Sequence, residues 1–299
     1  MSRNIYAPLR LILAMAIFGT LGIFVRNIPL SSAELALYRA VLASALIGGY
    51  LMLRKERIAA GIMKRELFLL LLSGAAMGFN WILLFEAYKY TTVSIATLSY
   101  YFAPIIVTAL CPVLFREHLS RLQVCCFIMS TLGVVLIIGA SGFGSSGSDL
   151  IGIGYGLGAA ALYATVILLN KFIRHVAGIR RTFLQFVAAL IVLVPYVAAT
   201  SGFHFMQLDG KGWVNLLIVG FIHSGLAYCL YFPSLKEMKG QQAAVLSYID
   251  PLVAVVVSVT VLGEALTVSQ IVGGALILGF ALINEIAPGK AQKKENGAV

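Results

Sequence analysis

The sequence predicts an all-α membrane protein of ten transmembrane helices, arranged as two inverted five-helix repeats. Composition is the first reason: 60% of the 299 residues are hydrophobic and 11% are charged, with a mean hydropathy of +0.95. A soluble domain of this length carries roughly 25% charged residues, so this chain has too little polar surface to cover a water-soluble globule. Recurring apolar runs and an internal repeat are the other two reasons.

Ten mostly apolar runs are each long enough to cross a hydrocarbon core about 30 Å thick. None shows the period-2 alternation of an outer-membrane barrel. The first run is too long for the apolar region of a secretory signal and lacks a convincing cleavage site, so we interpret it as a spanning helix. We expect the spans at residues 7–25, 33–53, 67–88, 93–115, 122–140, 150–170, 183–200, 213–232, 241–262 and 268–287.

Positive charge flanks the expected spans unevenly. Of the 22 lysines and arginines, 18 fall at the termini and in loops on one side, three in loops on the other, and Arg39 within a span. Because positive loops stay on the cytoplasmic side, we expect both termini in the cytoplasm of a protein integral to a bacterial inner (plasma) membrane. The same placement predicts membrane lipids as the partner of this net charge of +10, and no nucleic acid.

Cysteine and histidine give no pattern typical of a metal centre or of catalysis. The cysteines lie in apolar segments without metal-ligand or disulfide spacing, so we expect packing residues, no metal and no cofactor. The histidines form no HExxH or similar motif, so we expect no catalytic residues, and a membrane-embedded enzyme is the minor alternative. These residues are Cys111, Cys125, Cys126, Cys229, His118, His175, His204 and His223.

The two halves of the chain match at an offset of 147 residues. Trp81 and Phe85 of one segment correspond to Tyr228 and Phe232 of another, within a shared Gly-x-x-aromatic-x-Leu-x-Phe pattern. Five spans per repeat is an odd number, so the second half must be inverted. We expect a first repeat at residues 1–140, a linker at 141–149, a second repeat at 150–287 and a flexible cytoplasmic tail at 288–299. Such repeats are typical of alternating-access transporters with a midplane substrate site.

A motif that occurs once per half carries a family resemblance. Each half has a proline in its fourth span, a glutamate thirteen residues later, and then [ST]-x-x-Q. The residues are Pro104, Glu117, Ser120 and Gln123, and then Pro251, Glu264, Thr267 and Gln270. This pattern resembles the EamA type of the drug/metabolite transporter superfamily over residues 7–287. The resemblance implies a ten-helix secondary transporter with a central cavity for a small-molecule substrate. We expect a monomer or weak homodimer. Phe18-Gly19 replaces a tryptophan that many relatives have, so substrate assignments do not transfer.

The repeated motif residues have structural interpretations. Glu117 and Glu264 lie at span ends, each just before a capping box that would start the next helix. Pro104 and Pro251 lie near mid-bilayer, where proline removes a helical hydrogen bond and kinks the helix. Exposed backbone at that depth is tolerated when it faces protein or a water-filled cavity, so the kinks serve either packing or a cavity.

Asp250 breaks the symmetry of the repeat, because its counterpart is Ala103. An ionisable group near the midplane costs at least about 2.5–3.5 kcal/mol, which favours a functional role. We expect Asp250 to bind substrate and carry the coupling proton. The alternative is a buried acid that bonds a neighbouring hydroxyl or backbone group.

Two further polar residues lie within spans. Arg39 could clamp a carboxylate through two hydrogen bonds, or pair with Glu34 or Glu86 in the same outer half. His223 could shuttle a proton, or be a hydrogen-bonded packing residue. The sequence leaves both pairs of alternatives open.

Aromatic side chains are dense near the expected midplane and could wall a pocket for a ring or a cationic amine. They are Phe79, Trp81, Tyr100, Tyr101, Tyr163, Tyr228 and Tyr248. The predicted substrate-binding set combines most of them with polar neighbours: Asp250, Arg39, Trp81, Tyr100, Tyr101, Tyr228, Tyr248, Asn80 and His223.

The sequence therefore predicts a secondary active transporter of small metabolites that works by alternating access. We expect an exporter of amino acids or related amphoteric or amine compounds, coupled to protons through Asp250. The alternatives are an uncoupled facilitator of another metabolite and, less in keeping with the motifs, an enzyme.

Overall fold

The computed structural model describes residues 6–55, 64–115, 120–142, 148–238, 243 and 246–286. Within these ranges seven helical stretches are long and apolar enough to span a membrane, and three shorter apolar helices bring the set to ten. The predicted tail, most of the predicted linker and Glu117 lie outside the described residues.

The ten spans follow one another along the chain as expected, and in the described residues the first, fourth and eighth consist of more than one helical segment. The first span is α1 (Tyr6–Gly19) with α2 (Leu21–Arg26), and the fourth is α5 (Val93–Tyr100) with α6 (Ala103–Phe115). The eighth is α10 (Gly210–Leu217), the π-helical η2 (Ile218–Leu226) and α11 (Ala227–Glu237), preceded by the short η1 (Phe205–Gln207). The others are α3 (Ser32–Leu53), α4 (Lys64–Tyr90), α7 (Arg121–Gly142), α8 (Ser148–Phe172), α9 (Gly178–Thr200), α13 (Ile249–Thr260) and α14 (Val268–Ile286).

Local capping starts several of these helices. Before α7, the side chains of Ser120 and Gln123 each accept a hydrogen bond from the other's backbone N–H. Thr267 and Gln270 do the same before α14. Both predicted capping boxes are confirmed, and Ser31 makes a third one ahead of α3. Each box satisfies backbone donors that have no partner within the helix.

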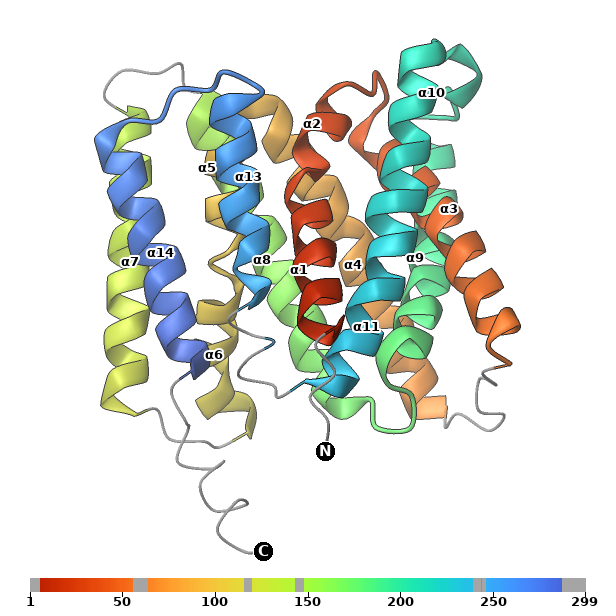
Figure 1. The fold of residues 1–299 in the computed structure, drawn as a ribbon, viewed down its shortest axis with the longest axis horizontal. Coiled ribbons are helices and arrows are strands. Elements are labelled where there is room, and N and C mark those ends of the chain that lie inside the picture. The colour runs from red at the N-terminus through yellow and green to blue at the C-terminus, as the bar shows by residue number, and fades with distance from the viewer. Residues whose placement is uncertain are drawn as a thin grey trace, which may run out of the picture.

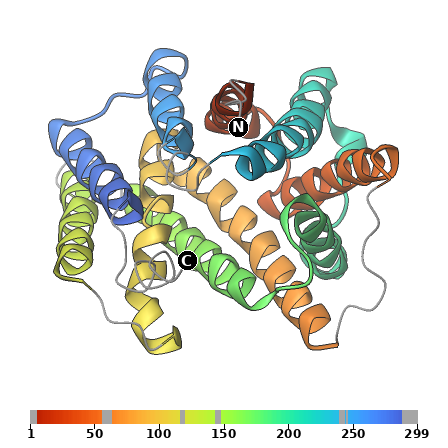
Figure 2. The same ribbon diagram turned by 60° about the horizontal axis from the view of Figure 1, so that its bottom comes forward.

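Neighbouring spans come in matched sets, as an inverted repeat requires. The third span packs on the sixth (α4 on α8) just as the eighth packs on the first (α11 on α1). Likewise α5 and α6 pack on α8 as α13 packs on α1, and α4 packs on α9 as η2 packs on α3. The equivalent spans α7 and α14 lie side by side at one edge of the molecule, while α4 and α8 run together through its middle (Figures 1 and 2).

The first span of each half lies among the helices of the other half. Helix α1 contacts α11 and α13, and α8 contacts α4, α5 and α6. Helix α1 begins at the same end of the molecule at which α14 ends (Figure 1). Following the predicted topology, we call this the inner end and the opposite end the outer end.

Glycines permit the closest helix crossings. A Cβ atom on Gly133 would lie 2.6 Å from the carbonyl oxygen of Gly273, and one on Gly273 equally close to that of Gly133. The crossing of α7 and α14 is therefore reciprocal, as expected for spans related by the repeat, and only glycine fits on either side.

Glycines also occur in pairs at four-residue spacing, namely Gly74/Gly78, Gly152/Gly156 and Gly154/Gly158, a pattern typical of close helix packing in lipid. Gly74 packs against α9 and Gly152 against Thr91, each with under 3 Å for an added Cβ, so these pairs do mark close contacts. A Cβ on Gly154 would meet nothing within 4 Å, whereas one on its partner Gly158 would lie 3.2 Å from Cδ1 of Leu83, so only one glycine of this pair marks a close contact. Spacing alone does not reveal which face of α8 points toward a neighbour.

Candidate functional site

Three interruptions of regular helix surround the predicted midplane site. The first span breaks at Thr20 between α1 and α2, and the fourth at Tyr101 and Phe102, just ahead of Pro104. The eighth span contains the π-helical segment η2. Pro104 is the second residue of α6 and Pro251 the third of α13. A proline near the first turn of a helix costs no internal hydrogen bond, so the proline of the fourth span follows a full break, a sharper change than the expected kink.

Asp250 lies in the first turn of α13 and meets the break of the fourth span. The hydroxyl of Tyr101 donates a hydrogen bond to its Oδ2 at 2.6 Å. Both side chains are half-buried. Helix α1 is pressed against the same place, because a Cβ on Gly19 would lie 2.5 Å from the carbonyl oxygen of Asp250. The structure thus brings this acid of the ninth span together with the first and fourth spans.

A series of neighbouring tyrosine rings begins at the tyrosine of this hydrogen bond. Tyr101 has ring neighbours in Tyr100, at 6.0 Å between centroids, and Tyr248, at 6.3 Å. Tyr100 in turn stacks on Tyr163 of α8 at 5.3 Å. These contacts gather four of the expected aromatic residues beside Asp250.

Arg39 is buried, with 4% of its surface exposed, on the inward side of α3. Its Nε donates to the hydroxyl of Ser224. Its guanidinium lies 4.8 Å from the ring centroid of Trp81 and 5.7 Å from that of Phe85, and such contacts stabilise a desolvated cation.

The alternative ion pairs of Arg39 do not form in the described part of the chain. Glu34 instead accepts hydrogen bonds from the backbone N–H of His204 and from the hydroxyl of Ser31, and Glu86 pairs with Lys89. Among the described residues, Arg39 has no carboxylate partner.

Arg39 and Asp250 approach the same group of rings from opposite halves of the chain. Tyr88, Tyr100 and Tyr228 each lie within electrostatic range of both. We call the rings around these two charges, namely Trp81, Phe85, Tyr88, Tyr100, Tyr101 and Tyr228, the central aromatic cluster. In the described structure the two charges form no ion pair with each other.

The π-helical segment presents two consecutive polar side chains to this region. The ring of His223 lies 3.2 Å from the carbonyl oxygen of Ile218, through Nδ1, and 3.0 Å from the hydroxyl of Thr20, through Nε2. Ser224 donates to the carbonyl of Val219 and accepts from Arg39. The wider π turn therefore connects the break at Thr20 with Arg39, and π turns often occur at functional sites.

The remaining expected residues differ in where they lie. The buried amide of Asn80 donates to the carbonyl of Ala159 at 2.6 Å, which ties α4 to α8. Tyr228 packs between Phe18 and Phe186. Phe79 pairs with Tyr196 instead. No three histidine, cysteine, aspartate or glutamate side chains of the described chain gather as a metal site would need.

A second charged cluster at the outer end was not predicted. Arg26 forms an ion pair with Glu264 and also donates to the carbonyls of Tyr88, at 2.9 Å, and Thr91, at 2.6 Å. Glu264 further accepts from the backbone N–H of Val93, at 2.9 Å, and from the hydroxyl of Ser258. The sequence indicated only a topology charge for Arg26 and a span-end glutamate for Glu264, since nothing local pairs residues so far apart.

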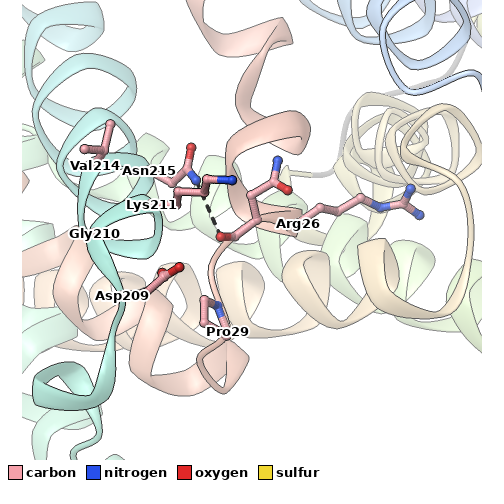
Figure 3. Close-up of a pocket in the computed structure, with 8 residues that line it drawn as sticks. Arg26, Pro29, Asp209, Gly210, Lys211, Val214 and Asn215 are labelled. Atoms are coloured by element: carbon pink, nitrogen blue, oxygen red, sulfur yellow. Dashed lines mark hydrogen bonds between the residues drawn. The ribbon is translucent and has the colours of Figure 1, made fainter.

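Two cavities at the outer end of the molecule are lined in part by Arg26, and we name them the outer cavity and the inner cavity. The outer cavity, of about 810 Å³, is lined by Arg26, Asn27, Pro29, Asp209, Gly210, Lys211, Val214 and Asn215. The inner cavity, of about 330 Å³, is lined by Val25, Arg26, Ile28, Leu30, Leu35, Phe85, Tyr88 and Lys89. Figure 3 shows Arg26 extending away from Asp209 and Lys211 toward the fourth-span side. Neither cavity is lined by a residue of the predicted substrate-binding set.

Ten spans in two inverted repeats, with charges and broken helices at the centre, define a membrane transporter of the inverted-repeat class. The model of the EamA-like transporter family matches the chain twice, at residues 6–139 and 150–285, so the chain belongs to that family.

Several known proteins are similar to the chain. An "Uncharacterized transporter YxxF" of Bacillus subtilis (strain 168) is 31% identical over 97% of this chain and 93% of its own length. A "Probable amino-acid metabolite efflux pump" of Salmonella typhimurium (strain LT2) is 27% identical over 57% of this chain and 60% of its own. One solved structure, described as "Crystal structure of protein", has a TM-score of 0.61 and 17% identity, covers 95% and 98% of the two chains, and supports the fold alone.

Proposed function

We propose that the protein exports amino acids or related amphoteric metabolites by alternating access, in exchange for protons that enter through Asp250. The observation that carries this proposal is that Arg39, from the first half of the chain, and Asp250, from the second, both contact the central aromatic cluster without forming an ion pair with each other. A zwitterion has one group for each: a carboxylate for the guanidinium and an ammonium for the carboxylate.

Arg39 suits the anion-binding role because its described contacts leave most of its N–H donors available for a ligand. A guanidinium has five N–H donors, and the described structure shows one of its nitrogens bonded, Nε to Ser224. The flat stacking on Trp81 holds the group in place without using those donors. A bound carboxylate would supply the missing counter-charge.

Asp250 suits the coupling role because it sits where the halves meet. It contacts the break of the fourth span through Tyr101, and its backbone contacts α1 at Gly19. Movement of these elements changes how well the carboxyl is hydrated. A carboxyl that alternates between poorly and well hydrated surroundings takes up a proton on one side and releases it on the other.

The export direction draws support from one relative alone, the pump described as acting on amino-acid metabolites. A cationic amine is a second candidate substrate, favoured by the tyrosines that surround Asp250. Uncoupled facilitated movement of another metabolite is the simpler alternative mechanism.

Purified protein in proteoliposomes tests the proposal. Vesicles are loaded with labelled amino acids or with their decarboxylated amines, and a proton gradient is imposed that drives protons in the direction opposite to solute release. Release of the labelled solute is followed with and without this gradient. We expect amino acids to move, faster with the gradient. Movement of amines alone would replace the substrate class, and equal rates with and without the gradient would favour a facilitator.

A further inference from the structure

The ion pair between Arg26 and Glu264 joins the two halves of the chain at the outer end. Arg26 ends α2, and Glu264 lies in the turn between α13 and α14. Through the carbonyls of Tyr88 and Thr91 and the N–H of Val93, the pair also holds the turn between α4 and α5. Three separate segments are therefore fastened at one point.

Arg26 also lines both cavities and, among the described residues, is the one that their linings share. The lining of the outer cavity includes the polar side chains of Asn27, Lys211 and Asn215. The inner cavity has Phe85 and Tyr88 in its wall. Those two residues belong to the central aromatic cluster, since Phe85 lies 5.7 Å from the guanidinium of Arg39 and Tyr88 is within electrostatic range of Arg39 and Asp250.

We infer that Arg26 is the gate residue of an outer solute pathway, which runs from the central aromatic cluster through the inner cavity to the outer cavity, and that Glu264 holds the gate shut. The path carries small polar solutes of the proposed substrate class, and only in this respect does the inference rest on the proposed function. The opening of the gate itself is independent of which solute passes.

The local construction allows this gate to open. Helix α2 is a six-residue segment that follows the break at Thr20, so it can tilt without moving α1. The side chain of Arg26 is 32% exposed and that of Glu264 8%, so the arginine is the partner with access to solvent. When Arg26 moves away from Glu264, the carbonyl oxygens of Tyr88 and Thr91 lose their hydrogen bonds to Arg26. Water that enters from the outer cavity then bonds these oxygens instead.

The chain offers a matched control at the inner end. There Arg10 of α1 pairs with Glu237 of α11 at 2.6 Å, again across the two halves. This pair links the same span to the second half, and neither of its residues lines either cavity. Glu237→Gln removes an ion pair of the same kind without touching the proposed gate.

The test uses thiol labelling and needs no substrate. Leu35 lines the inner cavity and is 2% exposed, so Leu35→Cys, in a background with the four native cysteines replaced, reports access to that cavity. The full chain in lipid nanodiscs reacts with a water-soluble maleimide. We expect Glu264→Gln and Arg26→Gln each to speed labelling roughly tenfold, the scale set by loss of a charge-assisted hydrogen bond, and Glu237→Gln to leave the rate unchanged.

Each variant is first checked for a single symmetric elution peak and an unfolding temperature near that of the parent. Unchanged labelling in both folded outer-end variants overturns the gate. An equal increase in Glu237→Gln overturns it as well, because general loosening then explains the effect. A gate that opens as expected in a protein that moves no amino acid leaves this inference standing and removes only the proposed substrate.

Discussion

Tyr101 donates a 2.6 Å hydrogen bond to Asp250, and the two residues belong to different halves of the internal repeat. The bond is placed by two local events, the interruption of the fourth span at Tyr101 and the start of α13 just before Asp250. An unbroken fourth helix would orient this tyrosine differently. The proposed coupling residue, in the second half of the chain, is thus bonded by a tyrosine at the helix break of the first half.

Replacement of Asp250 by asparagine tests coupling. The variant keeps the size of the side chain and can still bond Tyr101, but it cannot titrate. We expect proton-driven accumulation in proteoliposomes to be lost while solute exchange without a gradient is at least partly retained. Gradient-driven accumulation at the parental rate would show that Asp250 carries no coupling proton, and His223 and Glu86 would be the next candidates.

Tyr101→Phe removes the hydroxyl alone. A hydrogen bond to a charged group contributes about 1.5–3 kcal/mol, so we expect the transport rate in the same vesicles to fall about tenfold or more. Tyr90→Phe is the control, because Tyr90, the last residue of α4, contacts Tyr155 of α8 and is partly exposed. Equal rates for Tyr101→Phe and the parent would mean that the bond does not contribute to transport.

Arg39→Gln separates the two candidate substrate classes. We expect the affinity for an amino acid to fall roughly 10- to 100-fold, because one charge-assisted hydrogen bond is worth about 1.5–3 kcal/mol. Affinity for the matching decarboxylated amine should change little. Isothermal titration of each ligand in nanodiscs measures both. If the amino-acid affinity survives in Arg39→Gln, the carboxylate clamp is wrong.

Topology is tested by cysteines placed at opposite ends of the molecule. The end of α3 at Arg54 lies at the inner end, and Lys211 lies at the start of α10 at the outer end (Figure 1). In intact cells expressing a cysteine-free background, we expect an impermeant maleimide to label Lys211→Cys and to spare Arg54→Cys. The opposite pattern would reverse the orientation derived from the loop charges.

The reciprocal glycine crossing predicts a stability difference between two alanine variants. In Gly133→Ala, the new methyl group meets the carbonyl of Gly273 at 2.6 Å, and overpacking of this kind costs about 1–3 kcal/mol. Gly154→Ala has open space and gains up to about 1 kcal/mol of helix propensity. Thermal unfolding in detergent should show a lower midpoint for the first variant alone. A midpoint for Gly133→Ala at or above the parental value would mean that α7 and α14 separate readily.

The features that the sequence predicted well are local or repeated. In the capping boxes of Ser120 and Thr267, the two hydrogen-bonded residues are three positions apart, so each partner can be identified from the sequence. The sequence singled out Asp250 because its counterpart in the repeat is apolar, and its role in transport stays a prediction. The ten spans followed from the length of the apolar runs.

The features that escaped prediction depend on long-range contacts or small changes of helix pitch. Arg26 and Glu264 are separated by 238 residues, and no local pattern links them. The π-helical segment that brings Ser224 to Arg39 was not predicted, since the sequence pattern indicated only an apolar span there. The bond from the amide of Asn80 to the carbonyl of Ala159 joins residues 79 positions apart, so no local pattern indicated it, and the expected contact of Asn80 with substrate stays a prediction.

The exchange of first spans between the halves has a consequence for how such a chain could arise. Because α1 packs among α11 and α13, and α8 among α4, α5 and α6, neither five-helix half can bury its opening helix by itself. A protein with one copy of the repeat could do so only by trading that helix with a second copy inserted upside down. In the duplicated chain the two halves are covalently linked, so the exchange of first spans and the antiparallel packing of the halves are fixed. Separate single copies would have to form the same packing by dimerising in the membrane.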